Sequence, residues 1–264
     1  MHYINLDSID STNNEAKRLI SLKKLSEETC ISAKTQTAGR GRQGKSFFSP
    51  DSGLYMTLVF PVDCSIESQV TMTTRTACAV AESLENCTGQ CVGIKWVNDI
   101  YIRGKKCCGI LCEAVNDYET GRMRYLIAGI GINIYTGEWP DDLKEIAGSL
   151  YDEKNPAGSL DLNEFTERLK KQISEKEKEW LFEKNREEFL KYYKDHSIVL
   201  GKKIQYFEEG TAKEATAVDI DENGGLIVCP YEVSEDRQGT TDCSISTGTR
   251  FITLSSGEIS LRIH

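Results

Sequence analysis

Three glycines and three cations share seven consecutive positions of this chain, from Gly39 to Lys45. Glycine lets backbone N–H groups approach a ligand closely, and arginine offers a bidentate fork to an anion. The aromatic Phe47 follows two positions later. The stretch is typical of a loop built around a phosphate or a carboxylate. A solvated basic turn has the same composition, but such a cluster is less expected by chance in a chain of net charge −9.

The spacing Gly-x-Gly-x-x-Gly within this loop also occurs in dinucleotide-binding folds. That fingerprint requires a strand before the loop and a helix that begins directly from it. A strand is predicted at 30–34, but Pro50 and Gly53 make the residues after the loop a turn. A protein-kinase glycine loop is excluded because neither His-Arg-Asp nor Asp-Phe-Gly follows. The loop therefore predicts an anion site in a different fold.

A second polar segment covers residues 95–100. Asn98 and Asp99 stand there at the end of a predicted strand, where side chains can leave a sheet and meet a ligand. An amide and a carboxylate together can bind Mg²⁺ or a ribose, although a turn between two strands has the same sequence. Residues 11–13 (Ser-Thr-Asn) add hydroxyl and amide groups at the start of a predicted helix, where capping alone would explain them.

Two predicted strands contain glycines at informative positions. Lys106 enters a strand in which Gly109 interrupts the apolar residues. Glycine weakens a strand unless something must approach it closely, and the lysine alone would be an ordinary hairpin residue. Gly129, Gly131 and Asn133 recur at period two, so they share one face of their strand. That bare face suits a neighbouring element that packs closely, or a ligand.

The elements expected around these segments are hairpins with helices at intervals. Helices are predicted at 13–24, 71–85 and 161–194. The first and third follow capping-box spacings that begin at Thr12 and Asp161. Strands are predicted at 54–60, 91–96, 100–102, 108–114 and 124–134. This order indicates an α+β fold built on a sheet rather than on βαβ repeats.

The predicted helix at 161–194 has an apolar and a charged side. Four residues at helical spacing are expected to pack in the core: Phe165, Leu169, Ile173 and Trp180. The charged residues between Lys170 and Glu179 are expected to form a solvated face.

After His196 the chain changes character. Short strands recur, with glycine-rich turns between them, at 202–207, 216–220, 226–230, 250–254 and 258–263. Spacing of this kind predicts a small β-barrel as a second domain. We place the first domain at 1–196 and the second at 197–264.

The composition argues against several classes of site. None of the ten cysteines forms a Cys-x-x-Cys pair with a matching second pair, so a zinc ribbon is not expected. Only three histidines are present, which gives little support to a His–Cys nucleophile. The acidic charge argues against a broad nucleic-acid-binding face. No signal peptide and no apolar run of membrane-spanning length is found, and we expect a cytoplasmic protein with reduced cysteines.

Taken in order, the polar segments resemble the biotin–protein ligase family. Its hallmarks are a Gly-Arg-Gly-Arg-x-Gly-Arg loop, a Lys-Trp-Pro-Asn-Asp segment, a Lys-x-x-Gly-Ile-Leu-x-Glu strand and a Gly-x-Gly-x-Asn strand, all recognisable between residues 39 and 133. Residues 11–13 and Gln36 also match. Three positions depart from the pattern: Lys45 stands for the third arginine, Phe47 for a tryptophan and Val97 for the proline.

The resemblance implies both fold and activity. The fold would be a mixed-sheet catalytic domain of the biotin/lipoate ligase type, followed by a small SH3-like β-barrel that residues 257–262 resemble. The activity would be ATP-dependent: biotin becomes biotinyl-5′-AMP with release of pyrophosphate. The biotinyl group then passes to one lysine of a biotin carboxyl carrier protein or domain. Mg²⁺ would accompany ATP, with no zinc, haem or flavin.

The resemblance also bears on partners. Regulatory members of the family carry an N-terminal winged helix for DNA, whereas this chain starts directly with the catalytic domain. We therefore expect the monofunctional type, with neither DNA nor membrane binding. The sequence leaves the oligomeric state open, a homodimer included.

Individual residues receive roles by the same resemblance. Lys106, Arg42 and Arg40 are the expected catalytic residues, because cations must screen a carboxylate that attacks an α-phosphate. Contacts to biotin are implied for Ser11, Thr12, Asn13, Gln36, Arg40, Gly41, Arg42, Lys106, Gly109, Gly129 and Gly131. Contacts to ATP or the adenylate are implied for Arg42, Lys45, Phe47, Asn98, Lys106 and Asn133. Asp99 would lie near Mg²⁺, and the loop would order over the ligand and shield the adenylate from water.

Two other functions are weighed against this one. A lipoate–protein ligase shares the fold and the acyl-adenylate chemistry, but the arginine–glycine loop and the Lys-Trp-Val-Asn-Asp segment favour biotin. A non-catalytic nucleotide- or RNA-binding module could stack bases on Tyr206, Phe207 and Tyr231. The acidic net charge argues against that module.

Overall fold

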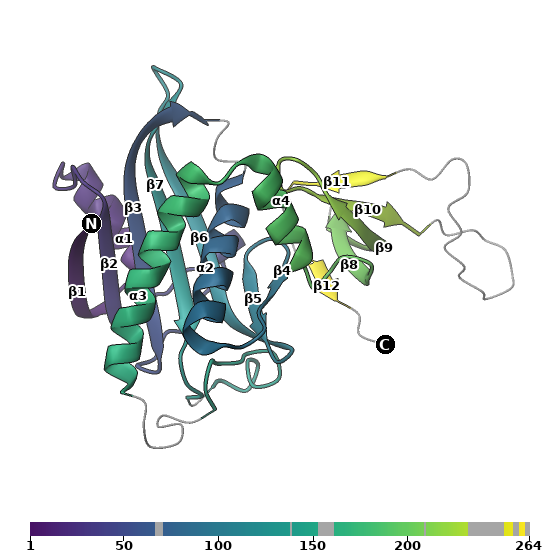
Figure 1. Cartoon of the computed structure of the whole chain (residues 1–264), viewed down its shortest axis with the longest axis horizontal. Coiled ribbons are helices and arrows are strands. Elements are labelled where there is room, and N and C mark those ends of the chain that lie inside the picture. The colour runs from purple at the N-terminus through teal and green to yellow at the C-terminus, as the bar shows by residue number, and fades with distance from the viewer. Residues whose placement is uncertain are drawn as a thin grey trace, which may run out of the picture.

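The structure is a computed structural model of the chain. It describes residues 1–66, 71–137, 139–152, 161–208, 210–231, 251–255 and 259–261. The strands in these ranges form a seven-stranded sheet and a five-stranded sheet. The smaller sheet lies at one end of the molecule, beside helix α4 (Arg186–Asp195) (Figure 1).

The larger sheet has the strand order β1-β2-β3-β7-β6-β5-β4. Its strands are β1 (His2–Ile9), β2 (Thr29–Gln36), β3 (Gly53–Ser65), β4 (Gly93–Lys95), β5 (Asp99–Ile102), β6 (Lys105–Asp117) and β7 (Arg122–Asn133). β1 runs parallel to β2, and the other neighbouring pairs are antiparallel. This mixed sheet confirms the predicted α+β class, although the sequence analysis missed β1.

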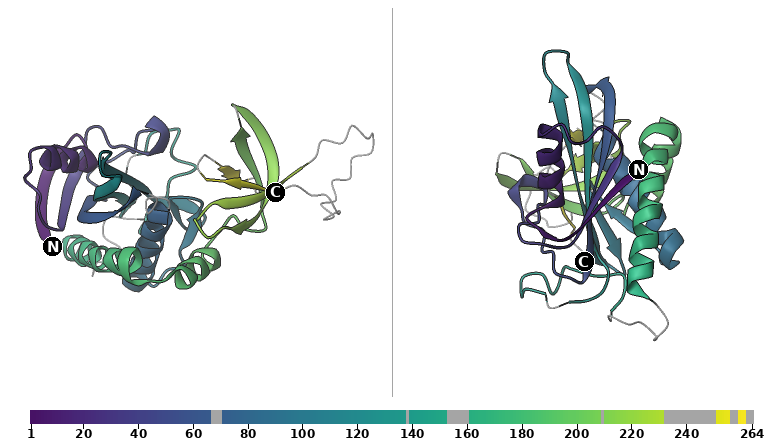
Figure 2. Two further views of the ribbon diagram at one scale, coloured as in Figure 1. Left: turned by 90° about the horizontal axis from the view of Figure 1, so that it is seen from above. Right: turned by 90° about the vertical axis from the view of Figure 1, so that its left-hand side faces the viewer.

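Helices cover both faces of this sheet (Figure 2). On one face α1 (Thr12–Ser21) buries Ala16 against Ile31, Val59 and Ile127. On the other face α2 (Met72–Thr88) and α3 (Leu162–Lys178) pack together over the larger core. The face that carries α1 therefore has the smaller apolar cluster, and it leaves part of the sheet to polar groups.

The register of the central strands gathers the glycines on the α1 face. Gly109 on β6 lies opposite Gly131 on β7, and Leu111 lies opposite Gly129. On the other side of β7, Thr57 of β3 lies opposite Gly129. Because side chains alternate between faces, three glycines of adjoining strands leave one bare patch in the middle of the sheet.

The long helix predicted at 161–194 is broken in the structure. α3 ends at Lys178, a π-helical turn covers Glu179–Glu183, and α4 begins after Asn185. Asn185 accepts a hydrogen bond from the Glu188 backbone N–H, and the Glu188 carboxylate accepts one from that of Asn185. This capping box starts a new helix, so the single-helix prediction is wrong. The predicted cap at Asp161 is present, since its side chain accepts from two backbone N–H groups.

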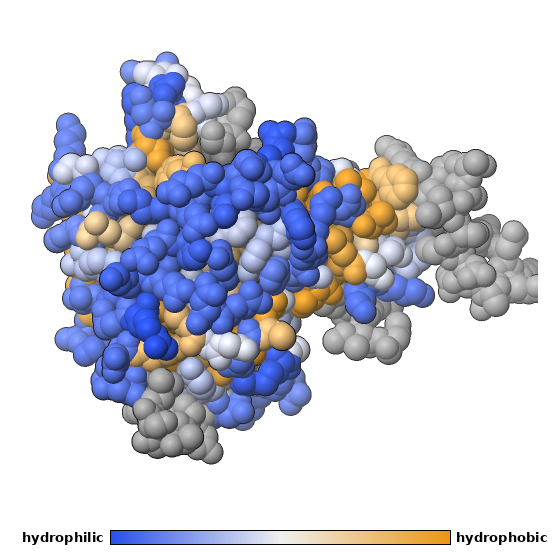
Figure 3. Space-filling view, viewed as in Figure 1, coloured by the Kyte–Doolittle hydropathy of each residue, from blue (hydrophilic) through white to orange (hydrophobic). Residues whose placement is uncertain are grey.

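The charge run on α3 is only partly solvated. Figure 3 shows mostly hydrophilic side chains over α2 and α3, and Lys171 and Glu175 are exposed. Lys170, however, is buried and donates to Asn5 Oδ1 at 2.9 Å. Glu177 is fully buried and accepts from the Thr76 hydroxyl. The predicted solvated face is therefore wrong at these two positions, where tertiary neighbours supply the polar partners, while the four residues of the apolar stripe are buried as expected.

The smaller sheet packs onto the same core as the larger one. Its strands, in the order β11-β10-β9-β8-β12, are β11 (Ile252–Leu254), β10 (Leu226–Pro230), β9 (Thr211–Ile220), β8 (Lys203–Glu208) and β12 (Ile259–Leu261). Buried residues such as Ile204 and Leu226 belong to the core that includes α2. The Trp96 indole N–H donates to Gly224 O at 2.9 Å across this junction. The SH3-like barrel and the boundary at 196/197 stay predictions.

Among the described residues, no helix is long and apolar enough to cross a membrane.

Candidate active site

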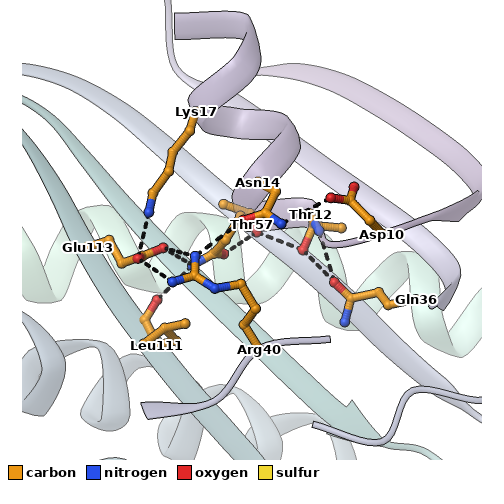
Figure 4. A network of polar contacts seen from close by, with 10 residues as sticks. Asp10, Thr12, Asn14, Lys17, Gln36, Arg40, Thr57, Leu111 and Glu113 are labelled. Carbon is orange, nitrogen blue, oxygen red and sulfur yellow. Dashed lines mark hydrogen bonds and ion pairs between the residues drawn. The ribbon is translucent and has the colours of Figure 1, made fainter. Parts of the chain in front are cut away.

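A chain of short polar contacts forms one wall of the site at the start of α1 (Figure 4). The Thr12 backbone N–H donates to Gln36 Oε1 at 2.9 Å, and the Thr12 hydroxyl lies 3.2 Å from the same oxygen. The Thr57 hydroxyl lies 2.8 Å from Thr12 Oγ1 and 2.6 Å from Asn13 Oδ1. Gln36 Nε2 donates to the Ser49 hydroxyl. These contacts fix the orientation of both amides in the wall.

The capping box predicted at Thr12 is wrong. Ser11 is the N-cap residue, and its side chain makes no cap hydrogen bond. Thr12 directs its hydroxyl and its N–H out of the helix to Gln36 instead. Both side chains are nearly fully buried, so the start of α1 belongs to the wall of the site.

Neighbouring side chains cover the bare glycine patch. A Cβ built on Gly129 would lie 2.2 Å from Asn13 Oδ1. A Cβ on Gly131 or Gly109 would lie 2.6 or 2.9 Å from the Phe47 ring. No side chain fits at these positions without displacing those neighbours. The patch therefore receives Asn13 at one end and Phe47 at the other.

The glycine–arginine loop folds back on itself above this patch. Gly41 N–H donates to Lys45 O at 2.7 Å, and Phe47 N–H donates to Gly39 O at 2.9 Å. A short turn at Arg42–Gly44 includes Gly44 with φ +77°, a conformation that glycine adopts without strain. These bonds make the loop a compact hairpin.

The two arginines of the loop reach opposite ends of the site. Arg40 donates through both terminal nitrogens to Glu113, at 3.1 Å each. Arg42 Nη1 lies 3.5 Å from Asn98 Oδ1. The loop thus spans the sheet from β6 to the segment between β4 and β5.

Lys106 and Asp99 form an ion pair at the second end. Lys106 Nζ lies 2.7 Å from Asp99 Oδ1, and both side chains are partly buried. A Cβ on Gly109 would lie 3.5 Å from Lys106 Cε as well as against the Phe47 ring. The ammonium stem and the aromatic ring therefore adjoin the same glycine, which places a cation next to the patch.

The amides assigned to nucleotide binding make protein contacts in this structure. Asn98 Nδ2 donates to Ile110 O at 2.8 Å. Asn133 Nδ2 donates to Gly148 O at 2.8 Å, so this side chain holds the 148 segment. Lys45 is exposed on the loop. Their binding roles stay predictions.

A small cavity lies between these groups. It has a volume of about 30 Å³ and is lined by Ser11, Thr12, Asn13, Gln36, Arg40, Phe47, Gly109, Leu111, Gly129, Ile130 and Gly131. All but Leu111 and Ile130 are residues that the sequence analysis assigned to the site. Because the Phe47 ring lies against Gly109 and Gly131, a ligand whose fused ring system lies on this part of the patch requires the Phe47 ring to move aside.

The sequence analysis gave no role to three polar residues of the site: Lys17, Thr57 and Glu113, of which Glu113 ends the Lys-x-x-Gly-Ile-Leu-x-Glu motif. Lys17 lies one helical turn after Asn13 on the same face of α1, and Glu113 continues the period-two face of Gly109 and Leu111. These two spacings could have predicted that Lys17 and Glu113 face the site. The sequence around Thr57 does not predict a site residue, because Thr57 lies inside an otherwise apolar strand.

Comparison with known proteins places these features in one family. Residues 6–133 match the model of the Biotin/lipoate A/B protein ligase family, and the matched range holds the polar wall, the loop, Lys106 and the glycine patch. The chain contains a biotin/lipoate protein ligase domain. The catalytic-domain fold that the resemblance implied is thereby confirmed.

Curated relatives of this ligase domain include proteins from Bacillus spizizenii and Mycobacterium tuberculosis. The bifunctional ligase/repressor BirA of Bacillus spizizenii is 40% identical over 152 residues, which cover 56% of this chain and 46% of BirA. The chain thus spans about half the length of the first curated relatives it matches. The biotin--[acetyl-CoA-carboxylase] ligase of Mycobacterium tuberculosis is 26% identical over 200 residues, 74% of this chain and 70% of the relative.

A solved structure resembles this chain along almost its whole length. It is the biotin protein ligase from Aquifex aeolicus in complex with biotin and ATP. Its TM-score is 0.71 with 28% identity, and the match covers 99% of this chain and 98% of that one. The similarity therefore extends beyond the ligase domain to the smaller sheet.

Proposed function

We propose that this chain is an ATP-dependent biotin–protein ligase. It would activate biotin as biotinyl-5′-AMP and transfer the biotinyl group to one lysine of a biotin carboxyl carrier protein or domain. The observation that carries the proposal is the arrangement around Gly109: a polar wall at one end, an arginine loop above, and Lys106 at the other end. The names of the relatives and the Aquifex complex support the same reaction.

The polar wall suits a ring that carries both hydrogen-bond donors and an acceptor. Thr12, Gln36 and Thr57 offer hydroxyl and amide groups within one connected set. A buried set of this kind rejects a ligand that leaves its groups unpaired. We assign the ureido ring of biotin to this wall, with Ser11 and Asn13 beside it and the bicycle over Gly129, Gly131 and Gly109 once Phe47 moves.

The reacting end brings two anions together. The biotin carboxylate must attack the α-phosphate of ATP, and fixed cations lower the cost of that approach. Lys106 would bind both groups, and Arg42 would screen them from the loop above, with the Gly41 backbone beside it. Pyrophosphate leaves, and the loop excludes water from the mixed anhydride. No histidine is needed, since the step requires charge stabilisation rather than a general base.

The nucleotide end would use Lys45, Phe47, Asn98 and Asn133. Mg²⁺ typically takes one or two carboxylates and completes its shell with phosphate oxygens and water. Asp99 fits that demand as a single carboxylate, provided that Lys106 turns from it toward the substrate anions. We therefore keep Asp99 as the candidate near Mg²⁺, which would neutralise phosphate charge when ATP is bound.

The two competing functions, a lipoate ligase and an RNA-binding module, require different features of the site and the surface. A lipoate ligase would place an unsubstituted dithiolane against the polar wall and leave its groups unpaired. An RNA-binding module would need aromatic side chains at the surface. Tyr206 is only 1% exposed, so it offers no stacking face, although Phe207 is exposed.

The proposal is tested by titration and turnover on the whole chain. Isothermal titration with biotin and with lipoate should give tighter binding for biotin, and pyrophosphate release should require both biotin and ATP. Transfer is then measured on an isolated biotin carboxyl carrier domain and on the same domain with its acceptor lysine replaced. Tighter lipoate binding, or pyrophosphate release without biotin, would overturn the assignment.

A further inference from the structure

Glu113 is the meeting point of three elements (Figure 4). Its Oε1 accepts from Lys17 Nζ at 2.6 Å and from Arg40 Nη2 at 3.1 Å. Its Oε2 accepts from Asn13 Nδ2 at 3.0 Å and from Arg40 Nη1 at 3.1 Å. Both oxygens thus have two donors, which come from α1 and from the loop, while Glu113 itself belongs to β6.

The surroundings keep this carboxylate charged. Burial disfavours the ionised form, but the hydrogen bonds from Lys17 and Asn13, the charge of Lys17 and the bond from Arg40 outweigh it and lower the pKa of Glu113. The Glu113 side chain is 18% exposed, against 38% for Arg40. A charge-assisted bidentate pair at such a site is stronger and more directional than a pair in full solvent.

The contact between Arg40 and Glu113 also restrains the backbone of the loop. It forms a bridge with Ser46 across the base of the loop. Its neighbours Gly39 and Phe47 are joined by the bond from Phe47 N–H to Gly39 O. Holding the Arg40 side chain on β6 therefore holds the backbone of both strands of the loop above the cavity, while the Phe47 ring can still rotate about its own side-chain bonds when a ligand enters.

The hydrogen bond from Asn13 to Glu113 also fixes a side chain of the polar wall. Its amide donates to Glu113 and to Leu111 O, while its oxygen lies against the Thr57 hydroxyl and over Gly129. The orientation of this amide decides whether the wall presents oxygen or nitrogen to the cavity. Glu113, as an acceptor, can only be met by the nitrogen.

We propose that Glu113 is a positioning residue: its carboxylate anchors Arg40, and so the loop over residues 39–47, above the cavity, and sets the amide of Asn13 in the cavity wall. Arg40 then acts on the substrate through the loop, with its fork committed to the protein. This inference rests on the proposed function, in which the cavity receives biotin and the loop retains the adenylate. Loss of the anchor would let the loop open and the adenylate escape or meet water.

A different role for the same pair makes the opposite prediction. Glu113 could compete with the carboxylate of biotin for Arg40, so that binding requires Arg40 to exchange partners. Removing the charge of Glu113 would then strengthen biotin binding. An anchor predicts weaker binding instead, so the sign of the change separates the two roles.

The test is Glu113→Gln in the full chain, which keeps the side-chain size and an acceptor for Asn13. Three quantities are measured: the Kd for biotin, the rate at which preformed adenylate is lost, and the rate of tryptic cleavage after Arg42 and Lys45. An anchor predicts that each changes by about tenfold toward weaker binding, faster loss and faster cleavage, equivalent to roughly 1.4 kcal/mol. Tighter biotin binding, or no change in all three, would overturn the proposal.

Lys17→Gln is the matched control, because it removes the shorter contact to the same carboxylate but none to the loop. It should leave tryptic cleavage of the loop unchanged. If Glu113→Gln fails to fold by its melting curve, Arg40→Gln removes the same pair from the exposed side. Where Glu113→Gln does fold, the double variant should be no worse than Arg40→Gln alone, and additive losses would contradict the anchor.

The two proposals fail in different ways. If wild-type protein releases no pyrophosphate with biotin and ATP, the ligase function fails, while the proteolysis series still reports on the loop. If wild-type protein is active and Glu113→Gln equals it in every assay, only the anchor fails.

Discussion

The ring of Phe47 occupies the space that a side chain on Gly131 would need, since a Cβ there would come within 2.6 Å of Phe47 Cε1. The loop residue comes from before β3 and the glycine from β7, so the two meet only in the folded sheet. The same ring packs against Tyr55 in a T-shaped arrangement with a centroid distance of 6.3 Å. The Phe47 ring can therefore lie against the sheet only because residue 131 has no side chain.

Gly131→Ala should place a methyl group on the bare patch where the bicycle of biotin would lie. We expect biotin binding to weaken by about tenfold or more, because an added methyl in a packed site costs roughly 1–3 kcal/mol. Titration of biotin into the variant measures the effect. In a Phe47→Ala background the same glycine change should cost about as much, because the methyl group meets the ligand itself, and a much smaller loss there would place the cost on the Phe47 ring.

Lys106→Met should abolish most of the adenylation rate. Removal of a group that stabilises developing charge typically costs about 10²–10³ in kcat, and the stem of methionine retains the packing against Gly109. Pyrophosphate release under saturating biotin and ATP gives the change. Lys105→Met is the matched control, since Lys105 is exposed and donates to Lys144 O outside the site. Equal rates in the two variants would refute the role of Lys106.

The buried acid Glu177 should make stability depend on pH in an unusual direction. Burial raises its pKa from an ordinary value of 4.5 to about 8, with the Thr76 hydrogen bond opposing the shift. Between these values the folded chain holds one proton more than the unfolded chain. The free energy of unfolding therefore falls as pH rises through this window, by about 1.4 kcal/mol per pH unit.

Glu177→Gln removes that titration and keeps a hydrogen-bond acceptor for Thr76. The difference in unfolding free energy between variant and wild type should grow in favour of the variant from pH 5 to pH 8. Urea unfolding at both pH values measures it. A difference that stays constant across this range would show that Glu177 does not titrate there.

Trp96→Phe should loosen the junction between the two sheets. The indole N–H is the donor to the carbonyl of Gly224, and a buried acceptor left without a partner costs about 1–3 kcal/mol. Thermal unfolding should show this loss. Because Trp96 precedes Asn98 by two residues, KM for ATP should also rise, while the Kd for biotin, measured without ATP, should stay near wild type.

The sheet and its loop were largely readable from the sequence because their signals are local. Alternating apolar residues and glycine turns predicted β5, β6 and β7, and the cluster of cations at 39–45 predicted the loop. The cavity lining is drawn mainly from residues that short motifs had identified. Motif spacing sufficed there because each motif lies in one strand, one turn or one helix start that adjoins the central sheet.

What the sequence did not predict depends on contacts between distant segments. Their charge alone led to the prediction that Lys170 and Glu177 are exposed to solvent. In the structure both are buried, and they form hydrogen bonds with Asn5 and Thr76. The helical pattern ran through Asn185, but a local capping box there competes with continuation. Arg40 was expected to organise the loop over the substrate anions, and only the structure shows that its guanidinium contacts Glu113 on β6. Only the folded chain shows which partner each polar group finds.

The three partners of Glu113 precede it by 73, 96 and 100 residues. β6 joins the central sheet through β7, which is made later still. A growing chain that has emerged only as far as β3 therefore already exposes the cationic loop without its carboxylate partner on β6. The long sequence separation therefore sets an order of events during synthesis. The ion pair between Arg40 and Glu113 forms only after the hairpin of β6 and β7 has paired with β3.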